Sequence, residues 1–185
     1  MKDVTGSDGQ DKRPILIIVM GVSGSGKTTL ARLLATRYGF RFVEADDFHS
    51  GENRRRMARG IPLTDSEREP WIASLCGELR NIRQGGCVLA YSGLRRAHRE
   101  RFRALGYRAV FFHLTGDPEI IRTRLESRTG HYMPPVLLDS QLAAFEGTAG
   151  ELDVFRLDPA MTPEGLAESA FAIIARIQAE IEGRS

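Results

Sequence analysis

The chain has 185 residues, of which 42% are hydrophobic and 27% are charged, and its formal net charge is +2. These values fit one globular domain, or one domain with a small mobile insert, and give no case for nucleic-acid binding. Cys76 and Cys87 match neither a metal-binding spacing nor a disulfide framework, so we expect reduced thiols in a cytoplasmic protein. No apolar run reaches the roughly 18 residues that span a membrane. Residues 1–13 are polar and are expected to form a flexible tail, neither signal peptide nor anchor.

Apolar runs and helix-breaking residues divide the rest of the chain, residues 14–185, into alternating strands and helices. Strands are expected at 15–20, 40–43, 87–91, 109–114 and 152–157. Helices are expected at 28–38, 52–59, from Thr64 or Asp65 to about 83, 95–105, 117–127, 136–145 and 163–182. This alternation predicts a single three-layer α/β domain in which helices flank a five-stranded parallel sheet.

A glycine-rich segment follows the first apolar strand and matches the pattern G-x-x-x-x-G-K-[ST]. In such a P-loop the backbone N–H groups and the helix N-terminus bind phosphate oxygens, the lysine reaches the β- and γ-phosphates, and the threonine hydroxyl ligates Mg²⁺. The alternative is a glycine-rich turn that binds nothing, but the strand before it and the helix after it favour the P-loop fold. The predicted ATP-binding residues are Gly21, Val22, Ser23, Gly24, Ser25, Gly26, Lys27, Thr28 and Thr29.

Two adjacent acids, Asp46 and Asp47, follow the second expected strand. The carboxyl ends of parallel strands gather ligands, so residues 44–49, 91–99 and 124–135 are expected to converge on an acceptor. A carboxylate there can accept a hydrogen bond, and later a proton, from an acceptor hydroxyl. The alternative is a pair of acids that caps the next helix. Adjacent acids point in different directions, so one is expected to serve the substrate and the other Mg²⁺ or the structure.

Several motifs in order along the chain resemble the gluconokinase family of small P-loop sugar-acid kinases, which are relatives of shikimate kinase. The matching segments are GVSGSGKTT at 21–29, ADDFH at 45–49, ENRRRMARGIPLTD at 52–65, Trp71, SGLRRAHR at 92–99 and RLESRTGHYMPPVLLDSQ at 124–141. The resemblance implies transfer of phosphate from ATP, with Mg²⁺, to the 6-hydroxyl of D-gluconate, which yields 6-phosphogluconate. It also implies a small-molecule partner and a homodimer.

The resemblance also implies roles for individual residues. Asp46 is the implied base and, with Thr28, a metal ligand, while Lys27 and Arg124 act on the phosphates. A mobile lid at about 124–140 carries Arg128, which contacts ATP and the transferred phosphoryl group. The implied acceptor-binding residues are Asp46, Asp47, His49 and His131, together with cations for the gluconate carboxylate among Arg54, Arg56, Arg95, Arg96 and Arg99. For each arginine the alternative is a solvated basic face.

The chain departs from the family pattern after the third expected strand. The family typically reads C-S-A-L-K-R-x-Y-R there, whereas this chain has Tyr91, Arg95 and His98 in place of the cysteine, lysine and tyrosine. Two alternatives therefore remain beside gluconate phosphorylation. One is a kinase of the same fold with another acceptor, such as shikimate or another aldonic acid. The other is a regulatory module that binds ATP without transfer. A contact of Pro159 with adenine is expected from fold analogy.

Overall fold

The structure is a computed structural model that describes residues 13–82, 85–127 and 136–183. Five parallel strands form one sheet, as the sequence predicted, and the structure shows their order to be β2-β3-β1-β4-β5. The strands are β1 Ile15–Met20, β2 Arg41–Glu44, β3 Cys87–Tyr91, β4 Arg108–Leu114 and β5 Val154–Leu157. Residues 1–12 of the predicted tail and residues 128–135 of the predicted lid lie outside the described residues.

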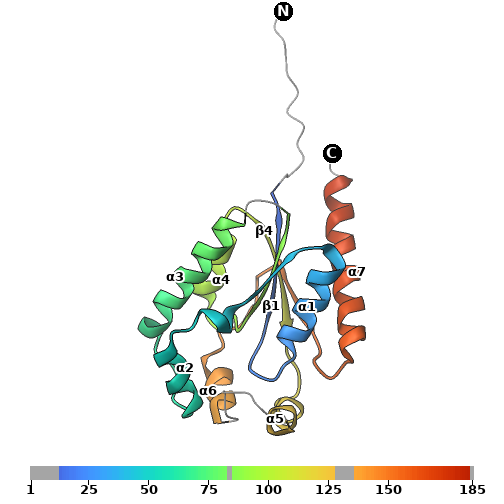
Figure 1. Cartoon of the computed structure of the whole chain (residues 1–185). Helices are drawn as coiled ribbons and strands as arrows, with labels where there is room; N and C mark the ends of the chain where they lie inside the picture. Colours follow the sequence, from blue (N-terminus) through green and yellow to red (C-terminus); the bar gives the residue numbers. More distant parts are fainter. Residues whose placement is uncertain (1–12, 83–84, 128–135, 184–185) are drawn as a thin grey trace, which may run out of the picture.

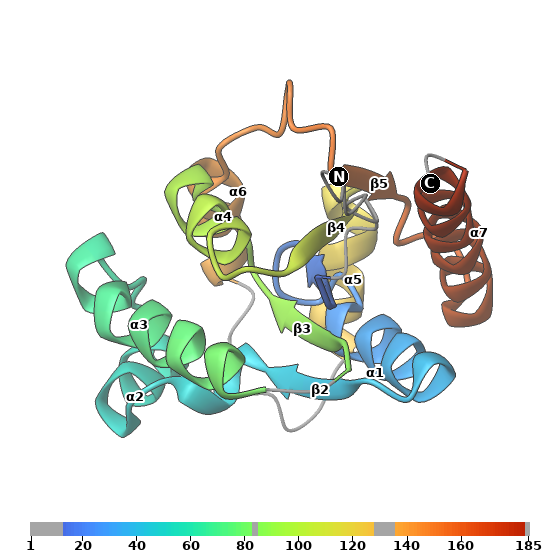
Figure 2. The same ribbon diagram turned by 90° about the horizontal axis from the view of Figure 1, so that it is seen from above.

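Helices cover both faces of the sheet and make the three layers visible in Figures 1 and 2. One face carries α1 Lys27–Tyr38 and α7 Pro163–Glu182, and the other carries α3 Asp65–Asn81 and α4 Arg96–Arg103. The remaining elements lie near the edge where the strands end: η1 Ala45–Phe48, α2 Gly51–Ala58, α5 Pro118–Ser127 and α6 Val136–Ala144. Among the described residues, no helix is both long and apolar enough to cross a membrane.

The central strand β1 is buried on both faces, which explains its continuous apolar sequence. Successive side chains of a strand point to opposite faces. Leu16, Ile18 and Met20 therefore pack in the cluster under α3 and α4, whereas Ile17 and Val19 pack in the cluster under α1 and α7. All five side chains are fully buried. The two clusters fix the sheet between its helical layers and so fix the edge at which the strand ends meet.

The element boundaries follow local signals within one or two residues of the prediction, with one element missed. Thr64 is the N-cap of α3 and forms a capping box with Glu67, which decides between the two predicted caps. Gly39 ends α1 in the left-handed conformation at φ 65°. The missed element is the single turn η1, because four residues are too few for a periodic hydrophobic pattern. This turn carries both adjacent acids.

Candidate active site

The glycine-rich segment 21–28 joins β1 to α1 and adopts the backbone of a phosphate-binding loop. Gly24 has φ +80°, and a Cβ atom there would lie 2.6 Å from Cγ of Leu125, so a side chain is excluded by both conformation and space. Gly26 has φ +98° and is the N-cap of α1. The glycines therefore allow the loop to curl against α5 and to present the N-terminus of α1 to a ligand.

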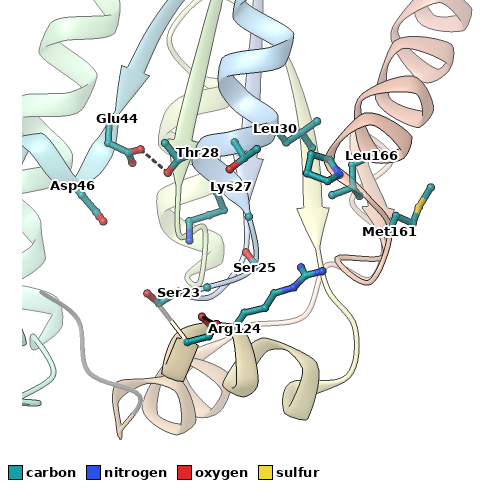
Figure 3. Close-up of a pocket in the computed structure, with 15 residues that line it drawn as sticks. Ser23, Ser25, Lys27, Thr28, Leu30, Glu44, Asp46, Arg124, Met161 and Leu166 are labelled. Atoms are coloured by element: carbon teal, nitrogen blue, oxygen red, sulfur yellow. Dashed lines mark hydrogen bonds between the residues drawn. The ribbon is translucent and has the colours of Figure 1, made fainter. Parts of the chain in front are cut away.

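This loop forms one wall of a cavity of about 430 Å³, shown in Figure 3. The Lys27 ammonium group donates a hydrogen bond to the carbonyl oxygen of Val22 at 2.8 Å, across the loop. Carboxylates lie at one end of the cavity and apolar side chains at the other, with Lys27 between them. The lining includes Ser23, Gly24, Ser25, Gly26, Lys27, Thr28, Thr29, Glu44, Asp46, Arg124, Met161, Pro163 and Leu166. This distribution of polar and apolar groups matches a nucleotide. Its base would lie at the apolar end and its phosphates at the acidic end, where a bound cation would neutralise the repulsion between phosphates and carboxylates.

Thr28, Glu44 and Asp46 bring three oxygen-bearing side chains to the polar end of the cavity. The Thr28 hydroxyl donates to a Glu44 carboxylate oxygen at 2.7 Å. Burial raises the pKa of Glu44, and the neighbouring charge of Asp46 raises it further, against the hydrogen bond from Thr28. Oxygen donors and negative charge suit Mg²⁺, which binds through one or two carboxylates and the substrate phosphates. The sequence predicted Thr28 and Asp46 as metal ligands and placed Glu44 in a segment that converges on the site, but assigned Glu44 no role in metal binding.

Glu44→Gln is expected to raise the Mg²⁺ concentration needed for half-maximal activity about tenfold, while leaving the fold intact. The amide keeps an oxygen for the Thr28 hydroxyl but removes the negative charge that attracts the cation. The measurement is initial rate against Mg²⁺ at fixed ATP. Glu52→Gln, which changes an exposed acid of α2, is the matched control and should leave the Mg²⁺ dependence unchanged. If the initial rate depends on Mg²⁺ concentration in the same way for Glu44→Gln and wild type, Glu44 does not bind the metal.

A second, smaller cavity of about 50 Å³ adjoins the first at Asp46, a residue that lines both. Its walls come from η1, α2, α3, α6 and the segment after β3, which the sequence places far apart. They combine polar groups with apolar surface, as a polyol acid requires. The lining residues are Asp46, His49, Met57, Pro62, Leu63, Arg68, Trp71, Ser92, Leu94, Leu137, Ser140 and Gln141. Asp47, although adjacent to Asp46, is exposed and lines neither cavity.

His49 is held inside the second cavity by the single tryptophan of the chain. Its ring stacks on Trp71 with a centroid separation of 4.0 Å, and the Trp71 indole N–H donates to the Ala45 carbonyl oxygen at 2.7 Å. Trp71 thereby contacts both ends of the turn that presents Asp46. Burial is the main reason that the pKa of His49 falls to about 4, so the ring is neutral near pH 7. At 4.0 Å from the Asp46 carboxylate, a neutral ring forms no ion pair.

The departures from the family pattern at Tyr91 and His98 lie behind this wall. The Tyr91 hydroxyl and Nδ1 of His98 are 2.8 Å apart, and Tyr91 is almost fully buried. The Tyr91 ring centroid is 5.2 Å from that of Trp71, and neither departure lines the second cavity. The two exchanged residues therefore contact each other in the core and do not form part of the cavity lining.

Among the described residues, Arg68 is the arginine that lines the second cavity, and it was not predicted from the sequence. Arg68 lies in the first turn of α3 and pairs with Asp65 at 2.7 Å. Three of the arginines predicted for the acceptor carboxylate line neither cavity: Arg54 is exposed, Arg56 pairs with Glu67 at 3.2 Å, and Arg95 pairs with Asp65 and Glu146. The sequence places Arg68 in the first turn of α3, four residues after the Thr64 cap. Only the tertiary packing shows that this turn faces the second cavity.

The prediction that Arg99 binds the acceptor carboxylate is wrong, because the Arg99 side chain is fully buried and lines neither cavity. Its guanidinium donates to both carboxylate oxygens of Glu151, at 2.9 and 2.5 Å. It also donates to the carbonyl oxygens of Gly93, Glu146 and Gly147. The i, i+4 spacing with Arg95 suggested a shared anion, whereas each arginine has its own carboxylate partners within the protein. Arg99 is therefore a structural residue.

The predicted lid is described only at its edges. Arg124 lies on α5 and lines the large cavity. Arg128 and His131 lie outside the described residues, so their predicted roles remain predictions. The expected adenine contact is corrected: Met161, Pro163 and Leu166 line the apolar end of the large cavity, whereas Pro159 does not.

A parallel sheet of this order, a phosphate-binding loop after β1 and acids after β2 define a P-loop kinase. Residues 17–133 match the family described as AAA domain. The chain is 40% identical to the gluconokinase of Gluconobacter oxydans (strain 621H), over 91% of this chain and 94% of that protein. It is 38% identical to the thermosensitive gluconokinase of Escherichia coli (strain K12), over 76% and 77% of the two chains.

The solved structures agree with the sequence relatives. A gluconokinase from Sinorhizobium meliloti 1021 superposes with a TM-score of 0.83 at 36% identity, over 93% of this chain and 98% of that chain. An unliganded sugar kinase from Janibacter sp. HTCC2649 gives a TM-score of 0.79 at 42% identity, over 86% and 93%. The chain belongs to the gluconokinase family.

Proposed function

We propose that this chain transfers the γ-phosphoryl group of ATP to the 6-hydroxyl of D-gluconate. The observation that carries the proposal is the position of Asp46, which lines both the phosphate-binding cavity and the second cavity. A group at that junction meets the acceptor hydroxyl where it must approach the γ-phosphate. The names of the relatives support gluconate as the acceptor.

The donor half of the site stabilises charge on the phosphates. The loop amides and the N-terminus of α1 hold the phosphate chain, while Lys27 and Arg124 contribute positive charge as it shifts toward the leaving oxygen. Thr28, Glu44 and Asp46 would hold Mg²⁺, which supplies further neutralisation of the β- and γ-phosphates. Met161, Pro163 and Leu166 offer an apolar surface to the base.

The acceptor half orients one hydroxyl and binds one carboxylate. Asp46 accepts a hydrogen bond from the 6-hydroxyl and takes its proton as the new O–P bond forms. His49, neutral near pH 7, is placed to exchange hydrogen bonds with the polyol. Arg68 supplies the guanidinium for the gluconate carboxylate, which it binds through parallel N–H groups.

The second cavity has room for only a few water molecules in this conformation. Binding of a six-carbon acid therefore requires the walls formed by α2 and α6 to move apart and then close again. Such closure excludes water from the phosphoryl group and limits wasteful hydrolysis of ATP. We propose that Arg128 and His131 join the site in the closed form.

Arg68→Met is expected to raise the KM for gluconate about tenfold to a hundredfold. This factor corresponds to the free energy that a hydrogen bond to a charged group contributes to binding. The KM for ATP should stay near the wild-type value, because Arg68 does not line the large cavity. The measurement is a coupled ADP-release assay with gluconate varied at saturating ATP. Arg54→Met, which changes an exposed arginine of α2, is the control and should not alter the KM for gluconate. If Arg54→Met raises KM and Arg68→Met does not, the carboxylate binds at α2 instead.

The proposed reaction is tested with the same assay over a panel of acceptors. Gluconate should release ADP far above the background without acceptor, and phosphorus NMR should show a phosphomonoester at the 6-position. Shikimate and other aldonic acids are the competing acceptors. ADP release with one of these and none with gluconate would refute gluconate as the acceptor, and ATP binding without transfer to any acceptor would indicate a regulatory module.

A further inference from the structure

Besides Asp46, which lines both cavities, a side chain of α6 links the P-loop to the second cavity. The backbone N–H of Ser23, the third residue of the P-loop, donates a hydrogen bond to the Gln141 side-chain oxygen at 2.7 Å. The two residues are 118 positions apart in the sequence. Ser23 lines the large cavity, and Gln141 lines the second. The bond therefore crosses the boundary between the donor and acceptor halves of the proposed site.

The helix that carries Gln141 is packed against both halves. Leu138 of α6 belongs to the cluster that contains Val22 of the P-loop and Leu125 of α5. Its neighbour Leu137 belongs to a separate cluster with Met57 of α2. Both leucines are almost fully buried. Two consecutive side chains thus fix α6 to the donor side and the acceptor side at once, and α6 lies with α2 and α5 near the edge where the strands end (Figure 1).

Ser23 is itself buried, so its N–H needs a partner within the site. A backbone carbonyl would satisfy that N–H as well, but it would not link the P-loop to the acceptor wall. A glutamine side chain has a second polar group, the amide NH₂, on the same planar unit as the bonded oxygen. Fixing the oxygen on Ser23 therefore fixes the direction of the amide group as well.

We propose that Gln141 is a positioning residue for phosphoryl transfer, which holds the P-loop and the acceptor wall in register. This inference rests on the proposed function and extends it to the alignment of the two substrates. Its consequence is efficient coupling: the γ-phosphoryl group passes to the acceptor hydroxyl rather than to water. Phosphoryl transfer depends chiefly on positioning and charge stabilisation, and a misplacement of about 1 Å can cost a hundredfold in rate.

Gln141→Met tests the proposal, because methionine has a similar length but lacks the acceptor for the Ser23 N–H. We expect kcat to fall about tenfold and the ratio of ADP released to phosphorylated product to rise above one. The dissociation constant for ATP should remain within about threefold of wild type, because Gln141 lines the second cavity and not the large one. The dissociation constant for gluconate is measured as well, so that a lost acceptor contact is distinguished from lost alignment. Fluorescence of Trp71, the single tryptophan and a wall of the second cavity, reports gluconate binding.

Asp139→Asn is the matched control on the same helix, because it removes only an exposed pair with Arg122. It should keep the ratio of ADP to product at one and kcat near wild type. A ratio of one and an unchanged kcat in Gln141→Met would overturn the proposal, as would equal uncoupling in Asp139→Asn. The wild-type enzyme tests the proposed acceptor separately: if gluconate supports no transfer, the same comparison is made with the acceptor that the panel identifies.

Discussion

Asp46→Asn is expected to lower kcat a hundredfold to ten-thousandfold, which is the usual contribution of a positioned general base. Asparagine keeps the size of the side chain but neither carries the charge nor accepts the proton from the acceptor hydroxyl. Nucleotide binding should persist, because the loop amides and Lys27 still hold the phosphates. The measurement is kcat in the ADP-release assay, together with direct titration of the protein with ATP.

Asp47→Asn is the matched control for this change. It alters the next residue in the same turn by the same chemistry, but Asp47 is exposed and lines neither cavity. We expect kcat within about threefold of wild type, since surface substitutions away from a site rarely matter. A kcat for Asp46→Asn above one tenth of wild type, or an equal loss in Asp47→Asn, would show that the two acids have been assigned the wrong roles.

Arg99→Met should cost about 3–5 kcal/mol of folding free energy, because removing one partner leaves buried charge without compensation. The Glu151 side chain is almost fully buried and would retain Arg103 as a cationic partner. The carbonyl oxygens of Gly93, Glu146 and Gly147 would also lose a donor. The loss is measured as the change in unfolding free energy by urea titration. Arg95→Met, which removes exposed pairs, is the control and should cost no more than about 1 kcal/mol.

The same ion pair makes stability depend on pH in the acid range. Burial by itself raises the pKa of Glu151, but hydrogen bonds from Arg99 and Arg103 outweigh it and lower the pKa to about 2. A carboxyl group with a depressed pKa stabilises the fold above its unfolded pKa, and this contribution is lost as pH falls from about 4.5 toward 2. Glu151→Gln should therefore flatten the pH dependence of stability in that window. An unchanged acid dependence in Glu151→Gln would assign the effect to other carboxyl groups.

Local sequence patterns were sufficient for the fold and for the phosphate-binding loop. The apolar run at 15–20 predicts a strand buried on both faces, and the glycines and lysine of 21–28 predict the phosphate-binding loop that follows it. Both features depend on residues adjacent in the chain, so their chemistry is readable from spacing alone. Asp46 was identifiable for a related reason: it directly follows a strand, and parallel strand ends meet at one edge.

The acceptor half depended on packing between distant segments. The i, i+4 spacing of Arg95 and Arg99 suggested an anion site, but α4 turns Arg99 into the core toward Glu151, a contact between residues 52 positions apart. Glu44, Arg68 and Gln141 reach the cavities because β2, α3 and α6 converge there. A guanidinium that binds substrate and one that binds a buried carboxylate look alike in sequence, since only burial and partners separate them. The sequence by itself thus determined the fold class and the phosphate-binding loop, whereas tertiary packing decided which charged side chains face the acceptor.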